Sequence, residues 1–108
     1  MISYDDFDKV EIRTGTIIEV NDFHKARKPA YQLTIDFGVA GIKRSSAQIT
    51  DMYDKQALIG KQILAVVNFP PKQIANFFSE CLVLGVVTPK GVVLLQTERP
   101  VANGLRVS

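Results

Sequence analysis

The chain has few of the residues that disulfides and most metal sites require. Its 108 residues include one cysteine, Cys81, and one histidine, His24. A single cysteine excludes an intrachain disulfide, and its apolar neighbours predict a buried strand thiol, which fits a reducing, cytoplasmic compartment. One cysteine and one histidine also give no recognisable zinc spacing. We therefore expect no disulfide, no metal site and no cofactor.

Motifs of catalysis are absent as well. The sequence contains no Ser-His-Asp order, no phosphate-binding loop and no HExxH motif. His24 lies in a basic loop without an evident acidic partner, and several carboxylates gather in the first eleven residues, as at the start of a helix. We therefore expect a binding protein and not an enzyme.

Long apolar runs are missing too, so we expect no membrane insertion. The acidic stretch 1–10 has the features of neither a signal nor a transit peptide. The composition, 46% hydrophobic and 22% charged, predicts one globular domain over residues 1–108. Residues 12–108 carry twelve basic and seven acidic side chains. This mildly basic body permits a nucleic-acid partner without requiring one.

The apolar pattern predicts a small β protein with a short helix at residues 54–58. In the first strand, Gly15 suggests a bulge or a tight bend. In the second, Tyr31, Leu33, Ile35 and Phe37 share one face. The expected strands are residues 11–23, 31–37, 42–46, 61–69, 80–87 and 91–97.

Three strands, a helix and two further strands make the order of an OB-fold, a five-stranded Greek-key β-barrel. An SH3-like barrel is the alternative, and the helix between strands three and four favours the OB-fold. Residues 1–9 form a helical extension, with Ser3 as a possible cap. Residues 98–108 form a tail that is too apolar to be free, so we expect it to pack against another surface.

The most distinctive stretch runs from Val66 to Leu84, between two core strands. Pro70 and Pro71 lack backbone donors, so they end the sheet pairing and stiffen the chain that follows. The stretch also carries an asparagine, a lysine and two adjacent phenylalanines. A rigid, aromatic and cationic connection at a strand end is typical of a binding surface.

Three groups of side chains are candidates for this surface. Aromatic residues form a platform for peptide side chains or nucleotide bases, or else belong to the core or a dimer interface: Phe69, Phe77 and Phe78. Basic residues contact phosphates, or else are solvated loop charges: Lys72, Lys43, Arg44, Lys25, Arg27 and Lys28. Polar residues bind peptide backbones or base edges, or else satisfy loop backbone groups: Ser46, Gln48, Asn68, Ser79 and Glu80.

Three blocks of the sequence resemble the tRNA-binding domain of the Trbp/EMAP type, which is also appended to methionyl- and phenylalanyl-tRNA synthetases. Val10–Val20 resembles its opening strand. Leu58–Lys72 resembles its Gly-Lys strand and the Pro-Lys/Arg loop that follows, and Ser79–Leu84 resembles its SxGM segment. The resemblance covers roughly residues 8–108 and implies an OB-type barrel with tRNA-binding capacity.

Within this family the chain is most similar to the small stand-alone CsaA type, described as export-related chaperones. Ser45–Ile49, Asn68–Pro71 and Arg99–Gly104 carry this similarity. Gln73 stands where the tRNA-binding relatives favour a second basic residue, and Ser46 is followed by Ala-Gln where they have Gly. The resemblance also implies a homodimer whose interface is built from the N-terminal helix and the C-terminal tail.

The function implied is a molecular chaperone for non-native or export-bound polypeptides, with tRNA-binding capacity and the export machinery as a partner. The alternative is a stand-alone, structure-specific tRNA-binding protein without a chaperone role. The expected peptide-binding residues are Phe69, Pro71, Phe77, Phe78, Asn68, Ser46 and Gln48. The expected RNA-binding residues are Lys72, Lys43, Arg44, Lys28, Arg27, Ser79 and Glu80.

Overall fold

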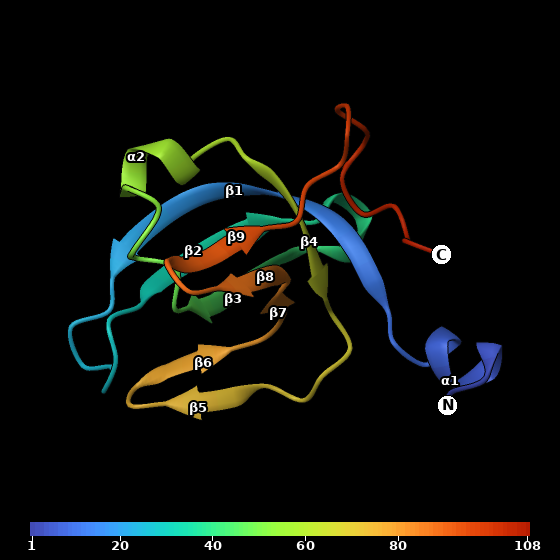
Figure 1. The fold of residues 1–108 in the computed structure, drawn as a ribbon, viewed down its shortest axis with the longest axis horizontal. Coiled ribbons are helices and arrows are strands. Elements are labelled where there is room, and N and C mark those ends of the chain that lie inside the picture. Colours follow the sequence, from blue (N-terminus) through green and yellow to red (C-terminus); the bar gives the residue numbers. More distant parts are fainter.

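Five antiparallel strands wrap into a nearly closed barrel in the computed structural model, which describes all 108 residues (Figure 1). Their order in the sheet is β3-β2-β1-β4-β7. A short helix lies between the third and fourth strands, so the predicted OB-type barrel is confirmed. The barrel strands are β1 (Ile12–Asp22), β2 (Tyr31–Asp36), β3 (Ile42–Ala47), β4 (Gln62–Val66) and β7 (Leu82–Val83).

The helices are short: α1 (Tyr4–Asp8), the 3-10 turn η1 (Gly38–Ala40) and α2 (Lys55–Leu58). Ser3 caps α1 by accepting a hydrogen bond from the Asp6 N–H, and the Asp6 carboxylate accepts one from the Ser3 N–H. None of these helices is long and apolar enough to cross a membrane.

The core fills the inside of the barrel, and β2 shows most directly how the sequence builds it. Its inward residues Tyr31, Leu33 and Ile35, and Phe37 just beyond it, are at most 8% exposed. The intervening residues are half-buried. Period-two alternation therefore assigns one face of β2 to the core, as predicted.

The irregularity in β1 lies at Ile18 and not at Gly15, where the sequence suggested it. The register of β1 against β4 runs unbroken through Gly15, whereas the register against β2 shifts between Ile17 and Glu19. A Cβ atom on Gly15 would lie 2.6 Å from the Phe37 ring, so the glycine makes room for that ring. The bulge leaves Ile18 46% exposed while Ile17 and Val20 both face the core.

Three of the later strands differ from the prediction. The strand predicted at 61–69 ends at Val66, and the one predicted at 80–87 divides into β7 and β8. The strand predicted at 91–97 ends at Leu94.

Two hairpins extend the barrel. One of them follows the two prolines, and the sequence did not predict it because its strands have only three residues each and offer little periodicity. The hairpins are β5 (Lys72–Ile74) with β6 (Phe77–Ser79), and β8 (Gly85–Thr88) with β9 (Gly91–Leu94).

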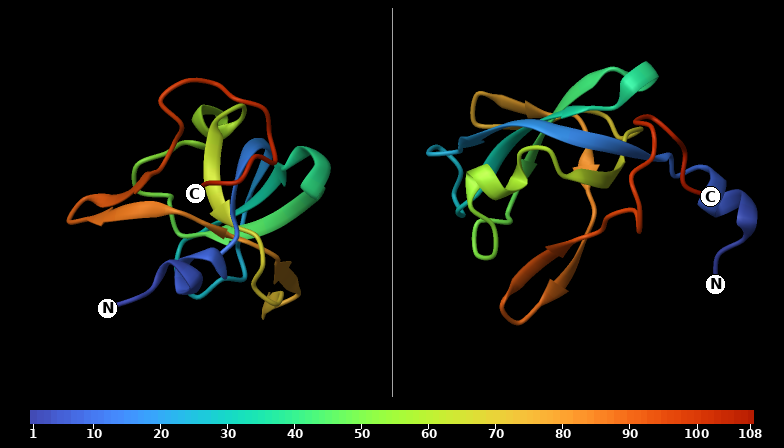
Figure 2. Two further views of the ribbon diagram at one scale, coloured as in Figure 1. Left: turned by 90° about the vertical axis from the view of Figure 1, so that its right-hand side faces the viewer. Right: turned by 90° about the horizontal axis from the view of Figure 1, so that it is seen from above.

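The C-terminal tail packs on β1 of its own chain. The Thr14 N–H donates to the Leu105 carbonyl (3.0 Å), and Thr14 accepts from the Gly104 N–H (2.7 Å). The Val107 N–H donates to the Ile12 carbonyl (2.8 Å). The tail thus covers the part of the β1 edge that β2 leaves free, since β2 begins its pairing at Thr16. Both chain ends lie at one end of the molecule (Figure 2).

Candidate binding site at the barrel seam

Side chains close the barrel between β3 and residues 79–81, where no strand pair forms. Two outward N–H groups of β3 donate to side-chain oxygens: that of Arg44 to Glu80 Oε1 and that of Ser46 to Ser79 Oγ, both at 3.0 Å. The Glu80 N–H donates to the Arg44 carbonyl (2.8 Å), and Ser45 Oγ donates to the Cys81 carbonyl (3.0 Å). These bonds satisfy edge groups that a strand partner would otherwise take.

Beside this seam lies a groove of about 580 Å³, which we call the seam groove, and Ser46, Ser79 and Cys81 belong to both. Nine of its fifteen lining residues are hydrophobic, and Lys72 is the one charged side chain among them. The seam groove is lined by Ser46, Ala47, Gln48, Ile49, Phe69, Pro70, Lys72, Ile74, Ser79, Cys81, Leu82, Val83, Gly85, Val87 and Val92.

The seam groove brings together five of the residues predicted to bind peptide or RNA: Ser46, Gln48, Phe69, Lys72 and Ser79. They come from the end of β3, the proline loop and the β5–β6 hairpin. Phe69 is 54% exposed, so its ring is an apolar surface available to a ligand.

The two adjacent phenylalanines face opposite ways, because successive residues of a strand alternate between its faces. Phe77 is 3% exposed and packs on Phe23, with ring centroids 5.2 Å apart. The guanidinium carbon of Arg44 lies 4.4 Å from the centroid of the same ring, in a cation–π contact. Phe78 is 54% exposed, pairs with Gln73 across the hairpin and does not line the seam groove.

Asn68 and Pro71 lie outside the groove lining. Asn68 Nδ2 donates to the Lys9 carbonyl (2.7 Å), and Asn68 Oδ1 accepts from the Glu11 N–H (3.0 Å). The asparagine therefore ties the start of β1 to the loop that carries Phe69. This contact fixes the base of that loop.

The predicted cationic residues divide between different surfaces. Strand alternation places Lys43 and Arg44 on opposite faces of β3. Arg27 and Lys28 are exposed on the β1–β2 loop, whose Phe23 and Ala30 pack against Phe77. The loop therefore lies beside the β5–β6 hairpin. We call the resulting surface, formed by Lys25, Arg27, Lys28 and Arg44, the basic side.

The groove lining also includes residues that were not predicted to bind a ligand, among them Cys81, which the sequence predicts to be a buried strand thiol. Cys81 is 6% exposed, and burial raises the pKa of its thiol to about 12, so the thiol is neutral at physiological pH. Val83, Gly85 and Val87 follow at every second position and also line the groove. This period-two spacing could have indicated a shared face from the sequence, but it is divided between β7 and β8. No group of three or more His, Cys, Asp or Glu side chains lies close enough to hold a metal ion.

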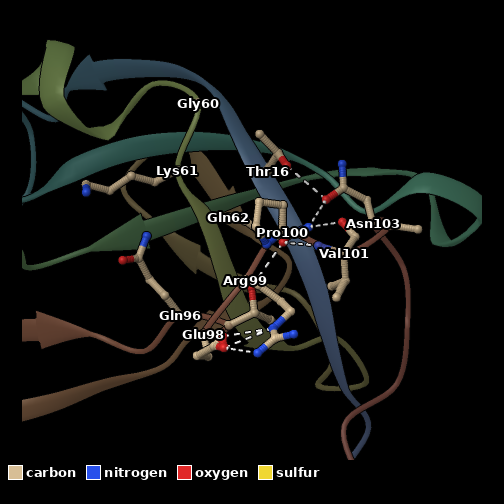
Figure 3. A pocket seen from close by; sticks show the side chains of 12 residues that line it. Thr16, Gly60, Lys61, Gln62, Gln96, Glu98, Arg99, Pro100, Val101 and Asn103 are labelled. Carbon is tan, nitrogen blue, oxygen red and sulfur yellow. Dashed lines mark hydrogen bonds and ion pairs between the residues drawn. The ribbon is translucent and has the colours of Figure 1, made fainter.

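A second, polar pocket of about 610 Å³ lies between the barrel and the tail (Figure 3). Gln62 is its centre: Nε2 donates to the Val101 carbonyl (2.7 Å) and to Asn103 Oδ1 (3.0 Å). Gln62 Oε1 accepts from the Val101 N–H (3.0 Å) and the Thr97 hydroxyl (3.1 Å). The same Asn103 oxygen accepts from Thr16 Oγ1 (2.9 Å). These groups are occupied in holding the tail to the barrel.

A family model described as "Putative tRNA binding domain" matches residues 12–106. The chain belongs to this tRNA-binding domain family. A CsaA chaperone protein from Picrophilus torridus is 57% identical over the whole of both chains, with a TM-score of 0.95. A CsaA chaperone from Bacillus anthracis str. Ames is 50% identical, with a TM-score of 0.94 over 100% of this chain and 99% of that one.

Curated relatives include methionine–tRNA ligases. That of Nanoarchaeum equitans is 34% identical over 99% of this chain and 14% of its own length. That of Methanococcoides burtonii is 31% identical over 96% of this chain and 15% of its own length. The chain thus spans about a seventh of the length of these relatives, and the similarity concerns one domain-sized part of each ligase.

The seam bonds predict a difference between two substitutions of Glu80. Glu80→Ala leaves the Arg44 N–H without its acceptor and should lower the free energy of unfolding by about 1 kcal/mol. Glu80→Gln keeps a side-chain carbonyl and should cost less than half as much. Urea denaturation of the two variants and the unsubstituted protein measures both effects. Equal stability of all three would show that this bond does not hold the seam.

Proposed function

We propose that the protein is a CsaA-like chaperone that binds non-native polypeptides in the seam groove, without catalysis. The observation that carries this proposal is the composition of the groove. Its volume is about 580 Å³, and its lining is mostly hydrophobic with one cationic residue. Exposed apolar segments of a non-native chain gain roughly 25 cal/mol for each Å² that they bury. A groove of this kind fits such segments better than it fits a strongly charged ligand.

The likeness to the two CsaA chaperone structures supports this function, since it extends over the whole chain. On that basis we further propose that the clients include export-bound polypeptides and that the protein acts in the cytoplasm with the export machinery. A surface of this shape recognises the apolar character of a client and not a particular sequence.

In this proposal Phe69 supplies the exposed aromatic face, while Ser46 and Gln48 hydrogen-bond the client backbone. Asn68 anchors one side of Phe69 to Lys9 and Glu11, just before β1, and Pro70 restricts the other side. The loop is therefore restrained before a ligand arrives, which lowers the entropy lost on binding. Phe77, under the Arg44 guanidinium, supports the hairpin from inside.

Two phenylalanines of equal exposure give a matched test. Phe69→Ala should weaken binding of a reduced, alkylated and labelled polypeptide by about tenfold, because a buried aromatic contact is lost. Phe78→Ala should leave the affinity within about twofold, since this ring is equally exposed but lies outside the groove. Fluorescence anisotropy measures both affinities. Equal affinity of both variants and the unsubstituted protein would contradict the proposed site.

Binding of tRNA is the second candidate function, and the basic side together with Lys72 favours it. The β1–β2 loop brings Arg27 and Lys28 beside the hairpin that begins at Lys72. Each phosphate that such a residue neutralises releases counterions, so binding by this surface depends steeply on salt. Membership of the tRNA-binding domain family supports this reading.

Salt titration with labelled bulk tRNA separates the two functions. If the basic side binds phosphates, Arg27→Ala should lower the slope of log affinity against log salt by roughly 0.7–0.9. Lys90→Ala, at the β8–β9 turn, should leave the slope unchanged.

In a competition experiment, excess unfolded polypeptide is then added to the tRNA complex. Salt-steep tRNA binding that the polypeptide does not displace favours the tRNA function, whereas polypeptide binding that persists where tRNA dissociates favours the chaperone function.

We also propose that two copies associate through α1 and the C-terminal tail. Both chain ends lie at one end of the molecule (Figures 1 and 2). Large apolar side chains are exposed there: Tyr4 is 92% and Leu105 50% exposed. Val39 is 96% exposed and lies beside Gly104 of the tail. Two grooves in one dimer would increase the apparent affinity for a long client.

Sedimentation velocity tests this association. Leu105→Asp should shift the protein toward monomer, because it places a charge in an apolar interface. Ile18→Asp is the control, since Ile18 is comparably exposed but lies on β1 beyond the tail. Identical sedimentation of both variants and the unsubstituted protein would argue against this interface.

A further inference from the structure

The stretch from Leu82 to Thr88 is bonded along one edge only. The Leu84 N–H donates to the Leu64 carbonyl of β4 (2.9 Å), and the Leu84 carbonyl accepts from Leu95, just after β9 (3.1 Å). Both groups of Leu84 therefore point to the same edge. Because these groups alternate sides along a strand, the N–H and C=O of Gly85 and Val87 point to the other edge.

That other edge has no partner. β8 pairs with β9 alone, and no backbone or side-chain hydrogen bond reaches the outward groups of Gly85 or Val87. The far edge of β9 differs, since the Leu94 N–H donates to the Tyr53 hydroxyl (3.1 Å). The hairpin projects from the barrel in both views of Figure 2, and Gly85, Val86 and Val87 are all exposed.

The seam groove borders this hairpin, since Val92, the cross-strand partner of Val87, lines it as well. Gly85 and Val87 both line it, and Val87 is 83% exposed. Across the groove, the Ser46 N–H already donates to Ser79 Oγ, so β3 offers fewer free backbone groups. An apolar groove thus adjoins a strand with one unpaired row of backbone donors and acceptors.

We propose that the client binds as an added strand on β8. Its backbone pairs with the N–H and C=O groups of Gly85 and Val87, and every second side chain enters the groove. This inference rests on the proposed chaperone function and specifies how the client is held. Main-chain bonds supply affinity without reading a sequence, which suits a protein that accepts many non-native chains.

The charge of the groove restricts the client further. Lys72 is its one charged lining residue, so a client segment with an acidic residue at one end is favoured and one with lysine or arginine in the groove is disfavoured. The occupant is thus an extended, apolar segment with no internal cation. Polar residues are tolerated at the positions that face solvent.

The test uses an eight-residue probe in which valine or leucine alternates with threonine and a glutamate stands at one end. Single N-methyl groups are placed on successive backbone amides, because N-methylation removes one donor and keeps the side chain. We expect about tenfold weaker binding at every second position and little change at the positions between. Calorimetry with the full chain gives the affinities.

A protein variant provides an independent measurement. Val87→Pro removes the outward N–H but no bond to β9, and prolines are tolerated at such edge positions. It should bind the unmethylated probe about tenfold more weakly than Val87→Ala, which removes the side chain and keeps the N–H. Amide exchange of Leu95, whose N–H donates to the Leu84 carbonyl, reports whether the hairpin of each variant is intact.

The outcomes separate the inference from the function that it rests on. Uniform effects of N-methylation, with Val87→Pro equal to Val87→Ala and binding still sensitive to Phe69→Ala, would overturn strand addition and leave the chaperone function standing. Absence of any binding by the probe and by unfolded polypeptide would overturn both. Protection of the Val87 amide from exchange in the free protein, growing with protein concentration, would assign the edge to a second copy and overturn the inference.

Discussion

The barrel depends on the way its seam is closed. β3 and the chain at residues 79–81 do not pair as strands, so most of the bonds between them involve a side chain. Glu80 takes part with both its carboxylate and its backbone N–H, and Ser79 contributes its hydroxyl. A closure made by side chains extends only as far as those side chains reach. The groove lies beside this closure, and Ser46, Ser79 and Cys81 belong to both.

The walls of the groove are held by contacts outside it. Phe77 packs on Phe23 and carries the Arg44 guanidinium on its ring, which fixes the β5–β6 hairpin to β3. Asn68 fixes the base of the proline loop to β1. These anchors leave Phe69 exposed on a restrained backbone.

The two proposed ligands use adjoining surfaces. The β5–β6 hairpin contributes Lys72 to the groove, and its inner face supports the loop that carries Arg27 and Lys28. An apolar groove beside a cationic surface gives polypeptide and nucleic acid separate sources of affinity. The first depends on buried apolar area and changes little with salt, whereas the second depends on released counterions.

Local patterns in the sequence were sufficient to predict the barrel. The alternation of Leu33 and Ile35 assigns a face of β2 without reference to any partner, and the position of the short helix favours the OB-fold over an SH3-like barrel. The candidate residues were predicted to share one surface, and five of them do line the groove.

Tertiary structure decided the rest, because those features depend on pairing between distant residues. The partner strands place the bulge of β1 at Ile18, and the Phe37 ring requires the glycine at position 15. Pairing within the β5–β6 hairpin determines that Phe77 is buried and Phe78 exposed. Which residues line the groove follows from where two strand edges part. By itself the sequence determined which residues prefer the interior. The register between strands determined which of the remaining residues come together at the groove.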